Sequence, residues 1–152
     1  MPRGRPARAR AGAQLFFYGT LLDPDIQWRV VGRALTGASF VPASLQGFRR
    51  VRAAGQWFPI LVPGLRSDLV EGGLATDLDG REIARIVAYE STDNYAMKPV
   101  SVRLRDGERR SALVFLPISG SAGRLRPTRE AWELESWQAR EKPRLLRLGL
   151  WP

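Results

Sequence analysis

Residues 16–22 constrain the fold of this chain most, because they combine an apolar strand pattern with an immediate glycine-containing loop. Directly after them, Asp23 and Pro24 are typical of a helix start, with Asp23 as N-cap and Pro24 at the first helical position. A strand, a tight loop and a helix start in this order direct free backbone N–H groups towards one point. Gly19 has no Cβ, so a ligand can approach the backbone closely there. We therefore predict a cradle for a carboxylate, a phosphate or a developing oxyanion.

Length and hydropathy favour one globular domain. The chain has 152 residues, and no apolar run approaches the roughly 20 residues that span a bilayer. We predict a disordered basic tail over residues 1–13, rich in Pro, Gly and Arg, and a single domain over residues 14–152. The tail lacks the apolar segment of a secretory signal, so we expect a cytoplasmic protein with no membrane partner.

The net charge of +9 raises the question of a nucleic-acid partner. All but two of the 24 basic residues are arginine, and outside the tail they are scattered with few interleaved aromatic residues. This distribution favours a compositional bias over a binding stripe. A nucleic-acid binder therefore stays a disfavoured alternative, which a steep salt dependence of binding after tail deletion would support.

The chain contains neither histidine nor cysteine. Their absence removes Ser-His and Cys-His nucleophile systems, disulfides and the usual zinc sites, so we predict neither a metal nor a cofactor. Proton transfer must then fall to carboxylates, tyrosines, or the two lysines, Lys98 and Lys142.

Hydrophobic periodicity predicts a sheet-rich chain with a few short helices. Strands are predicted at residues 14–21, 35–52 (with a bend), 56–63, 69–76, 95–104 and 111–116. Helices are predicted at residues 24–32, 79–89 and 128–140, with Asp79 as the cap of the second. Asp106 and Gly107 indicate a hairpin, and the prolines of residues 56–63 confine that strand to an edge. We predict an α+β fold in which a small mixed β-barrel is flanked by short helices.

Glu90 is the carboxylate that we single out, because it follows the helix predicted at residues 79–89 among apolar neighbours. Apolar surroundings disfavour the charged form and raise a carboxyl pKa to about 6–7, which suits proton shuttling. The alternative is that Glu90 caps the helix or pairs with an arginine. Tyr18 and Tyr95 have a similar alternative, in which each ring packs and its hydroxyl bonds the backbone.

Several segments in order resemble the gamma-glutamylcyclotransferase-like family, in particular its gamma-glutamylamine cyclotransferase-like branch. The resemblance covers roughly residues 15–116, and its segments are Tyr18-Gly19-Thr20-Leu21-Leu22, Gly47-Phe48-Arg49-Arg50, Phe58-Pro59-Ile60-Leu61-Val62-Pro63, Val70-Glu71-Gly72-Gly73-Leu74, Tyr89-Glu90 with Tyr95, Pro99-Val100-Ser101-Val102 and Asp106-Gly107. The family folds as a small mixed β-barrel with flanking helices, which agrees with the element pattern.

The resemblance implies a reaction. In that family a γ-glutamyl group cyclises to 5-oxoproline and releases an amine, and a glutamate in the position of Glu90 shuttles the proton. By the same resemblance the substrate-binding residues are Tyr18, Gly19, Thr20, Leu21, Pro59 and Tyr95. Ser91 follows Glu90 where the family often has glycine, and Met97 stands where it commonly has arginine. A non-catalytic module that binds a small carboxylate ligand is therefore the second hypothesis.

Overall fold

The computed structural model describes residues 12–90, 93–118 and 124–149 of the chain. The predicted tail and the loop at residues 119–123 fall almost entirely outside these ranges. Among the described helices, none combines the length and the hydropathy needed to cross a membrane.

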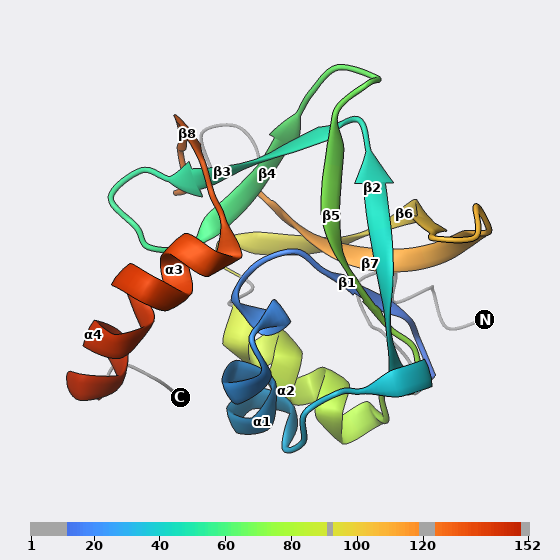
Figure 1. Cartoon of the computed structure of the whole chain (residues 1–152), viewed down its shortest axis with the longest axis horizontal. Helices are drawn as coiled ribbons and strands as arrows, with labels where there is room; N and C mark the ends of the chain where they lie inside the picture. The colour runs from blue at the N-terminus through green and yellow to red at the C-terminus, as the bar shows by residue number, and fades with distance from the viewer. Residues whose placement is uncertain (1–11, 91–92, 119–123, 150–152) are drawn as a thin grey trace.

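Five strands close into a barrel in the order β1 (Leu15–Phe17), β5 (Leu69–Ala75), β2 (Phe40–Gln46), β6 (Tyr95–Leu104) and β7 (Arg109–Pro117) (Figure 1). Neighbouring strands are antiparallel except β1 and β7, which are parallel and close the barrel. The long β6–β7 hairpin turns at Asp106 and Gly107, and Gly107 takes the left-handed conformation with φ 89°. The predicted small mixed barrel is confirmed.

A second sheet has the order β4 (Pro59–Pro63), β3 (Phe48–Ala53), β8 (Pro127–Ala131). Strand β4 is an edge strand with a proline at each end, as its sequence indicated. Trp57 and Phe58, which we had placed in the same strand, lie instead in the loop that connects β3 to β4.

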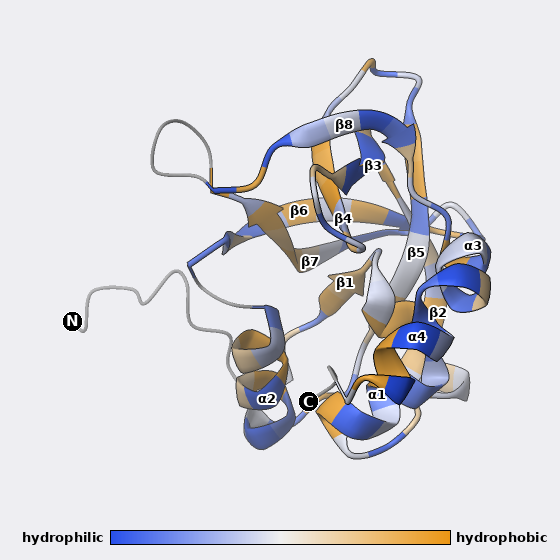
Figure 2. Cartoon of the chain, turned by 90° about the vertical axis from the view of Figure 1, so that its left-hand side faces the viewer, coloured by the Kyte–Doolittle hydropathy of each residue, from blue (hydrophilic) through white to orange (hydrophobic). Residues whose placement is uncertain are grey.

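The predicted helix over residues 128–140 is wrong in its first part. Residues 128–131 belong to β8, which pairs with β3 through Val51–Ala131 and Ala53–Pro127. Strand β8 is an edge strand, exposed along most of its length and largely hydrophilic in Figure 2, so its sequence carries no apolar alternation. The helical part is α3 (Leu134–Arg140), and α4 (Lys142–Arg147) follows.

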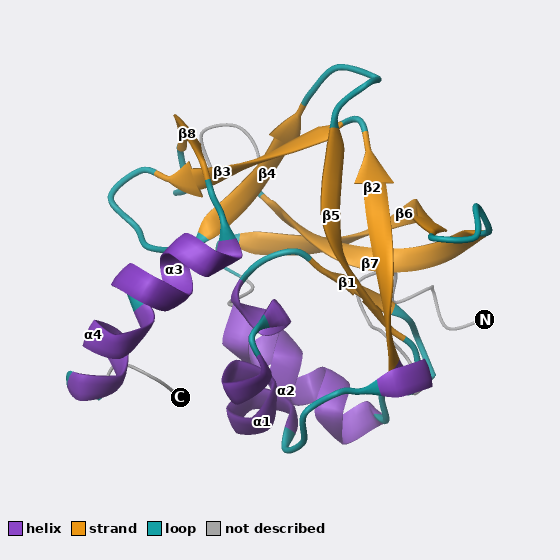
Figure 3. Ribbon diagram, viewed as in Figure 1, coloured by secondary structure: helices purple, strands orange, loops and turns teal. Residues whose placement is uncertain are grey.

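The remaining helices are α1 (Pro24–Val31), α2 (Gly80–Glu90) and two short 3-10 helices, η1 (Thr20–Leu22) and η2 (Gly37–Ser39). Helices α1 and α2 lie together at one end of the barrel (Figure 3). Helix α2 begins with a capping box, in which Asp79 Oδ1 accepts from the Glu82 N–H at 2.8 Å and Glu82 Oε1 accepts from the Asp79 N–H at 3.0 Å. The prediction that Asp79 caps this helix is confirmed.

Strand β1 contributes to two apolar cores. Leu15 and Phe17 belong to the cluster that includes the buried residues of α1, α2 and α3, whereas Phe16 and Tyr18 belong to a cluster built mainly from strand residues. This alternation follows from the two-residue period of a strand. The loop after β1 consequently starts between the two cores. The end of β1 lies close to β5, as shown by the collision that a Cβ on Gly72 would make with the carbonyl oxygen of Phe17.

Candidate active site

All seven residues predicted to form the site line one pocket with a volume of about 360 Å³. They are Tyr18, Gly19, Thr20, Leu21, Pro59, Glu90 and Tyr95. The pocket is also lined by residues that the sequence analysis did not assign to the site: Phe16, Phe17, Trp57, Phe58, Ala88, Tyr89, Asn94 and Phe115. Segments far apart in the chain thus converge on one hollow, as a substrate site requires.

Glu90 is the last residue of α2 and lies in the pocket wall. Burial raises the pKa of its carboxyl from 4.5 to about 7. Neither an arginine nor any hydrogen-bond donor of the described residues pairs with this carboxyl, so the expected alternative, an ion pair at the helix end, is not observed. Near neutral pH the group is therefore able to exist with and without its proton.

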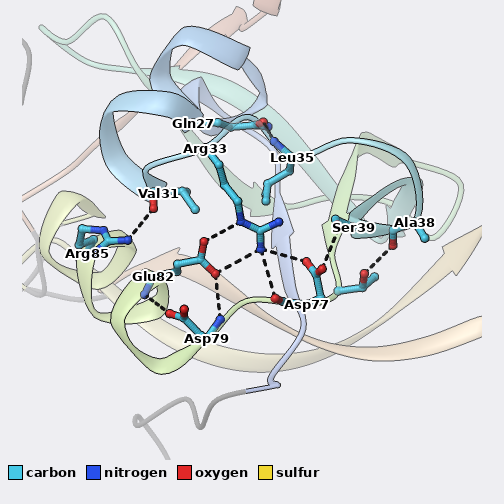
Figure 4. Close-up of polar contacts among 11 residues, drawn as sticks. Gln27, Val31, Arg33, Leu35, Ala38, Ser39, Asp77, Asp79, Glu82 and Arg85 are labelled. Atoms are coloured by element: carbon cyan, nitrogen blue, oxygen red, sulfur yellow. Dashed lines mark hydrogen bonds and ion pairs between the residues drawn. The ribbon is translucent and has the colours of Figure 1, made fainter.

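Polar contacts at the other end of α2 fix the helix that carries Glu90 (Figure 4). Arg33 Nε donates to Glu82 Oε2 at 2.7 Å, and Arg33 Nη2 donates to Asp77 Oδ1 at 3.1 Å. Arg85 Nη2 donates to the carbonyl oxygen of Val31 at 2.6 Å, which joins α2 to the end of α1. The hydrogen bonds from Arg33 hold the pKa of the Glu82 carboxyl below its usual value, and the pair stays ionised at neutral pH.

The loop at Tyr18–Leu21 presents backbone donors. Within the described ranges, no acceptor is bonded to the N–H groups of Gly19, Thr20 and Leu21, whereas the Leu22 N–H donates to the Gly19 carbonyl at 3.0 Å. The start of α1, which we expected to add donors, does not do so. Its own N-cap, Asp23, accepts from the N–H groups of Asp25 and Ile26. The cradle is therefore confined to the loop.

Three side chains hold this loop. Arg50 Nη1 donates to the carbonyl oxygen of Tyr18 at 2.9 Å, and Gln27 Nε2 donates to that of Leu21 at 2.8 Å. The hydroxyls of Thr20 and Tyr89 lie 2.6 Å apart and form a hydrogen bond between the loop and α2, beside Glu90. The cradle and the carboxyl are thus connected through neighbouring residues.

The tyrosine hydroxyls bond the backbone, as the packing alternative anticipated. Tyr18 donates to the Phe115 carbonyl at 2.5 Å, and Tyr95 donates to the Pro59 carbonyl at 3.1 Å. Burial raises the pKa of both phenols above the ordinary value. Because both phenols stay protonated, neither is suited to act as a base at neutral pH. Glu90 is the titratable group of the pocket that suits this role.

Gly19 lies against Pro59. A Cβ on Gly19 would lie 3.1 Å from Cγ of Pro59, closer than an ordinary van der Waals contact. The loop therefore packs tightly against the start of β4. Two segments of the family resemblance, the one that contains Gly19 and the one that contains Pro59, are thus in contact.

Comparison with known proteins decides the family. The profile of the family described as "Gamma-glutamyl cyclotransferase, AIG2-like" matches residues 15–139. The chain belongs to this family. AIG2-like protein A of Arabidopsis thaliana is 24% identical over 132 residues, which are 87% of this chain and 76% of that protein.

Solved structures of this family share the fold. A structure titled "Gamma-glutamyl cyclotransferase" superposes with a TM-score of 0.59 at 16% identity and covers 70% of this chain and 67% of its own. An AIG2-like protein from Mus musculus superposes with a TM-score of 0.58 at 19% identity and covers 80% of this chain and 88% of its own. The resemblance drawn from the ordered motifs is confirmed at the level of family and fold.

Of the two residues that differ from the family pattern, Met97 and Ser91, the structure describes Met97. Met97 is buried in the apolar core and does not line the pocket. Among the described residues that line the pocket there is neither arginine nor lysine. The donors that this lining offers to an anionic group are therefore uncharged: backbone N–H groups, the Asn94 carboxamide and one hydroxyl of the Thr20–Tyr89 pair. Ser91 lies outside the described residues.

Proposed function

We propose that this protein cyclises a γ-glutamyl amine or peptide to 5-oxoproline and releases the amine, with Glu90 as the proton shuttle. The observation that carries the proposal is that a carboxyl with a pKa of about 7 and a loop of free backbone N–H groups line the same pocket. Membership of the gamma-glutamyl cyclotransferase, AIG2-like family supports the same reaction class.

The reaction needs no nucleophile from the protein. The α-ammonium of the substrate gives a proton to the Glu90 carboxylate, and the free α-amine attacks the γ-carbonyl carbon. A C–N bond forms and the carbonyl oxygen becomes an oxyanion in a tetrahedral intermediate. When the original C–N bond breaks, Glu90 gives this proton to the leaving nitrogen, and its carboxylate then takes the second proton from the ring nitrogen and passes it to the released amine. The products are 5-oxoproline and the amine, and the carboxylate is regenerated.

Two physical effects supply the rate. Ring closure is intramolecular, so a pocket that holds the γ-glutamyl chain folded contributes up to about 7–11 kcal/mol in favourable geometry. In this proposal the N–H groups of Gly19, Thr20 and Leu21 bind the carboxylate and the oxyanion, and one such donor is worth about 3–4 kcal/mol. A chain without histidine or cysteine loses nothing for this chemistry.

The test is release of 5-oxoproline from γ-glutamyl compounds by the wild type and by Glu90→Gln. Glutamine keeps the shape of the side chain but cannot carry the proton, so we expect turnover to be abolished with the fold retained. Glu108→Gln, in the exposed β6–β7 hairpin, is the matched control. An active Glu90→Gln variant rejects the assigned role.

A non-catalytic carboxylate-binding module is the second candidate, favoured by Met97, which stands where the family commonly has arginine. Calorimetry separates the two functions. A γ-glutamyl amine that binds the wild type and is recovered unchanged supports the module and contradicts the enzyme.

A further inference from the structure

Few polar side chains of the pocket remain available to a ligand. The hydroxyls of Tyr18 and Tyr95 donate to backbone carbonyls, and those of Thr20 and Tyr89 bond each other, which leaves one O–H in that pair. Besides it, the Glu90 carboxyl and the Asn94 carboxamide line the pocket without a hydrogen-bond partner among the described residues. The loop N–H groups complete the set.

A γ-glutamyl group matches this set and uses most of it. Its ammonium is a partner for Glu90, and its α-carboxylate and γ-carbonyl accept from the loop N–H groups. The Asn94 carboxamide is left for the scissile amide. Among the described residues that line the pocket, no side chain of opposite charge is left for a carboxylate or an ammonium in the leaving group.

The rest of the wall is apolar and mostly aromatic. It is formed by Phe16, Phe17, Leu21, Trp57, Phe58, Pro59, Ala88 and Phe115. Trp57 and Phe58 pack edge to face with ring centroids 5.3 Å apart, and Phe58 lies 6.5 Å from the ring of Tyr95. These rings form a continuous apolar surface that suits an aromatic or branched aliphatic ligand group.

We infer that the amine released by this enzyme is uncharged and apolar apart from its reacting nitrogen, an inference that rests on the proposed function. A leaving group that carries a carboxylate or a second ammonium is disfavoured, because burying an unpaired charge is costly. An aromatic leaving group instead gains contact with Trp57 and Phe58. Peptides with a free carboxyl terminus and γ-glutamyl conjugates of lysine are therefore poor substrates.

Three matched substrates test the inference. γ-Glutamyl-phenylalaninamide and γ-glutamyl-phenylalanine share the same ring and differ only in the charge of the carboxyl terminus. γ-Glutamyl-alaninamide is neutral and lacks the ring. We expect kcat/KM for 5-oxoproline release to be at least tenfold higher for the phenylalaninamide than for either of the others. Turnover of the acid that equals or exceeds that of the amide overturns the inference and leaves the proposed function standing.

Binding gives a readout that does not depend on turnover. Calorimetry of the same compounds with Glu90→Gln is expected to give the lowest Kd for the phenylalaninamide. Equal affinities contradict the inference even if no compound is turned over, whereas absent turnover by the wild type contradicts the proposed function.

A variant locates the effect. Phe58→Ala is expected to reduce the preference for phenylalaninamide over alaninamide at least threefold. Trp28→Ala, at a ring that is 63% exposed on α1 and outside the pocket, is the control and should leave the preference unchanged. An unchanged preference in Phe58→Ala contradicts the placement of the leaving group.

Discussion

Nη1 of Arg50 lies 2.9 Å from the carbonyl oxygen of Tyr18 and donates a hydrogen bond to it. In a trans peptide unit the carbonyl and the following N–H point in opposite directions, so this contact turns the Gly19 N–H away from the guanidinium. Arg50 also donates to the Glu71 and Trp132 carbonyls and stacks over the Trp132 ring, 5.5 Å from its centroid. One side chain thereby joins β5 and the end of β8 to the loop.

Arg50→Lys tests this positioning role. Lysine keeps the charge but loses the planar fork, so the Tyr18–Gly19 peptide is held less firmly. We expect kcat to fall about tenfold, equivalent to about 1.4 kcal/mol, with little change in KM. The ¹⁵N–¹H resonance of Gly19 in the ligand-free protein should move as well. Arg52→Lys, on the same strand and paired with Glu130, is the control. A Gly19 resonance that stays in place contradicts the role.

Gly19→Val is expected to abolish substrate binding without unfolding the barrel, because the new side chain meets Pro59 and fills the approach to the loop N–H groups. Overpacking of this kind costs about 1–3 kcal/mol of stability. Calorimetry and thermal unfolding measure the two effects separately. Gly80→Ala serves as control, since a Cβ there has nothing within 4 Å. Retained affinity in Gly19→Val argues against the cradle.

The pKa of about 7 for Glu90 predicts the pH dependence of activity. The carboxylate is the form that accepts the proton, so kcat/KM should rise with pH through about 7. In the substrate complex the ammonium stabilises the carboxylate, and the corresponding rise in kcat should occur at lower pH. Initial rates measured between pH 5 and 8.5 check both the rise in kcat/KM and the rise in kcat. A flat profile of kcat/KM across this range is incompatible with Glu90 as the base.

The same pKa shift predicts that Glu90 lowers stability at alkaline pH. The folded-state pKa, about 7, lies above the value of 4.5 for the unfolded chain, so the favourable contribution is complete below 4.5 and is lost as pH rises through 7. Glu90→Gln should therefore exceed the wild type in unfolding free energy by about 3 kcal/mol at pH 8 and come close to it near pH 4.5. Urea denaturation at the two pH values measures the difference. A variant that is less stable than the wild type at pH 8 contradicts the shift.

Lys142→Met should loosen α3 and α4 from the site. Lys142 Nζ lies 2.8 Å from Oδ2 of Asp23, which is fully buried, and 2.6 Å from Oδ2 of Asp25. Burial alone would raise the pKa of Asp23, but hydrogen bonds from Lys142 and Gln138 lower it below its usual value. Removing one partner should cost about 2 kcal/mol of unfolding free energy. Arg144→Met, at an exposed pair with Glu141, is the control. Equal losses in both variants contradict the assigned contact.

Local sequence determined the elements that frame the site. The apolar run before Gly19, the N-caps Asp23 and Asp79, and the period of the residues before Glu90 act over a few neighbours, so they predicted the strand, the loop and both helix starts. The ordered motifs predicted the family. The sequence did not predict strand β8, because an exposed edge strand has no apolar alternation. Its pairing with β3 also depends on residues more than seventy positions away.

The sequence by itself thus determined the fold class and the positions of Glu90 and the N–H loop along the chain. Only the tertiary structure decided that Arg50 and Gln27 hold this loop, that Trp57 and Phe58 complete the pocket wall, and that the Glu90 carboxyl is desolvated. The physical reason is distance along the chain. Capping and periodicity are local, whereas burial and a shared cavity depend on segments that meet only after the barrel has closed.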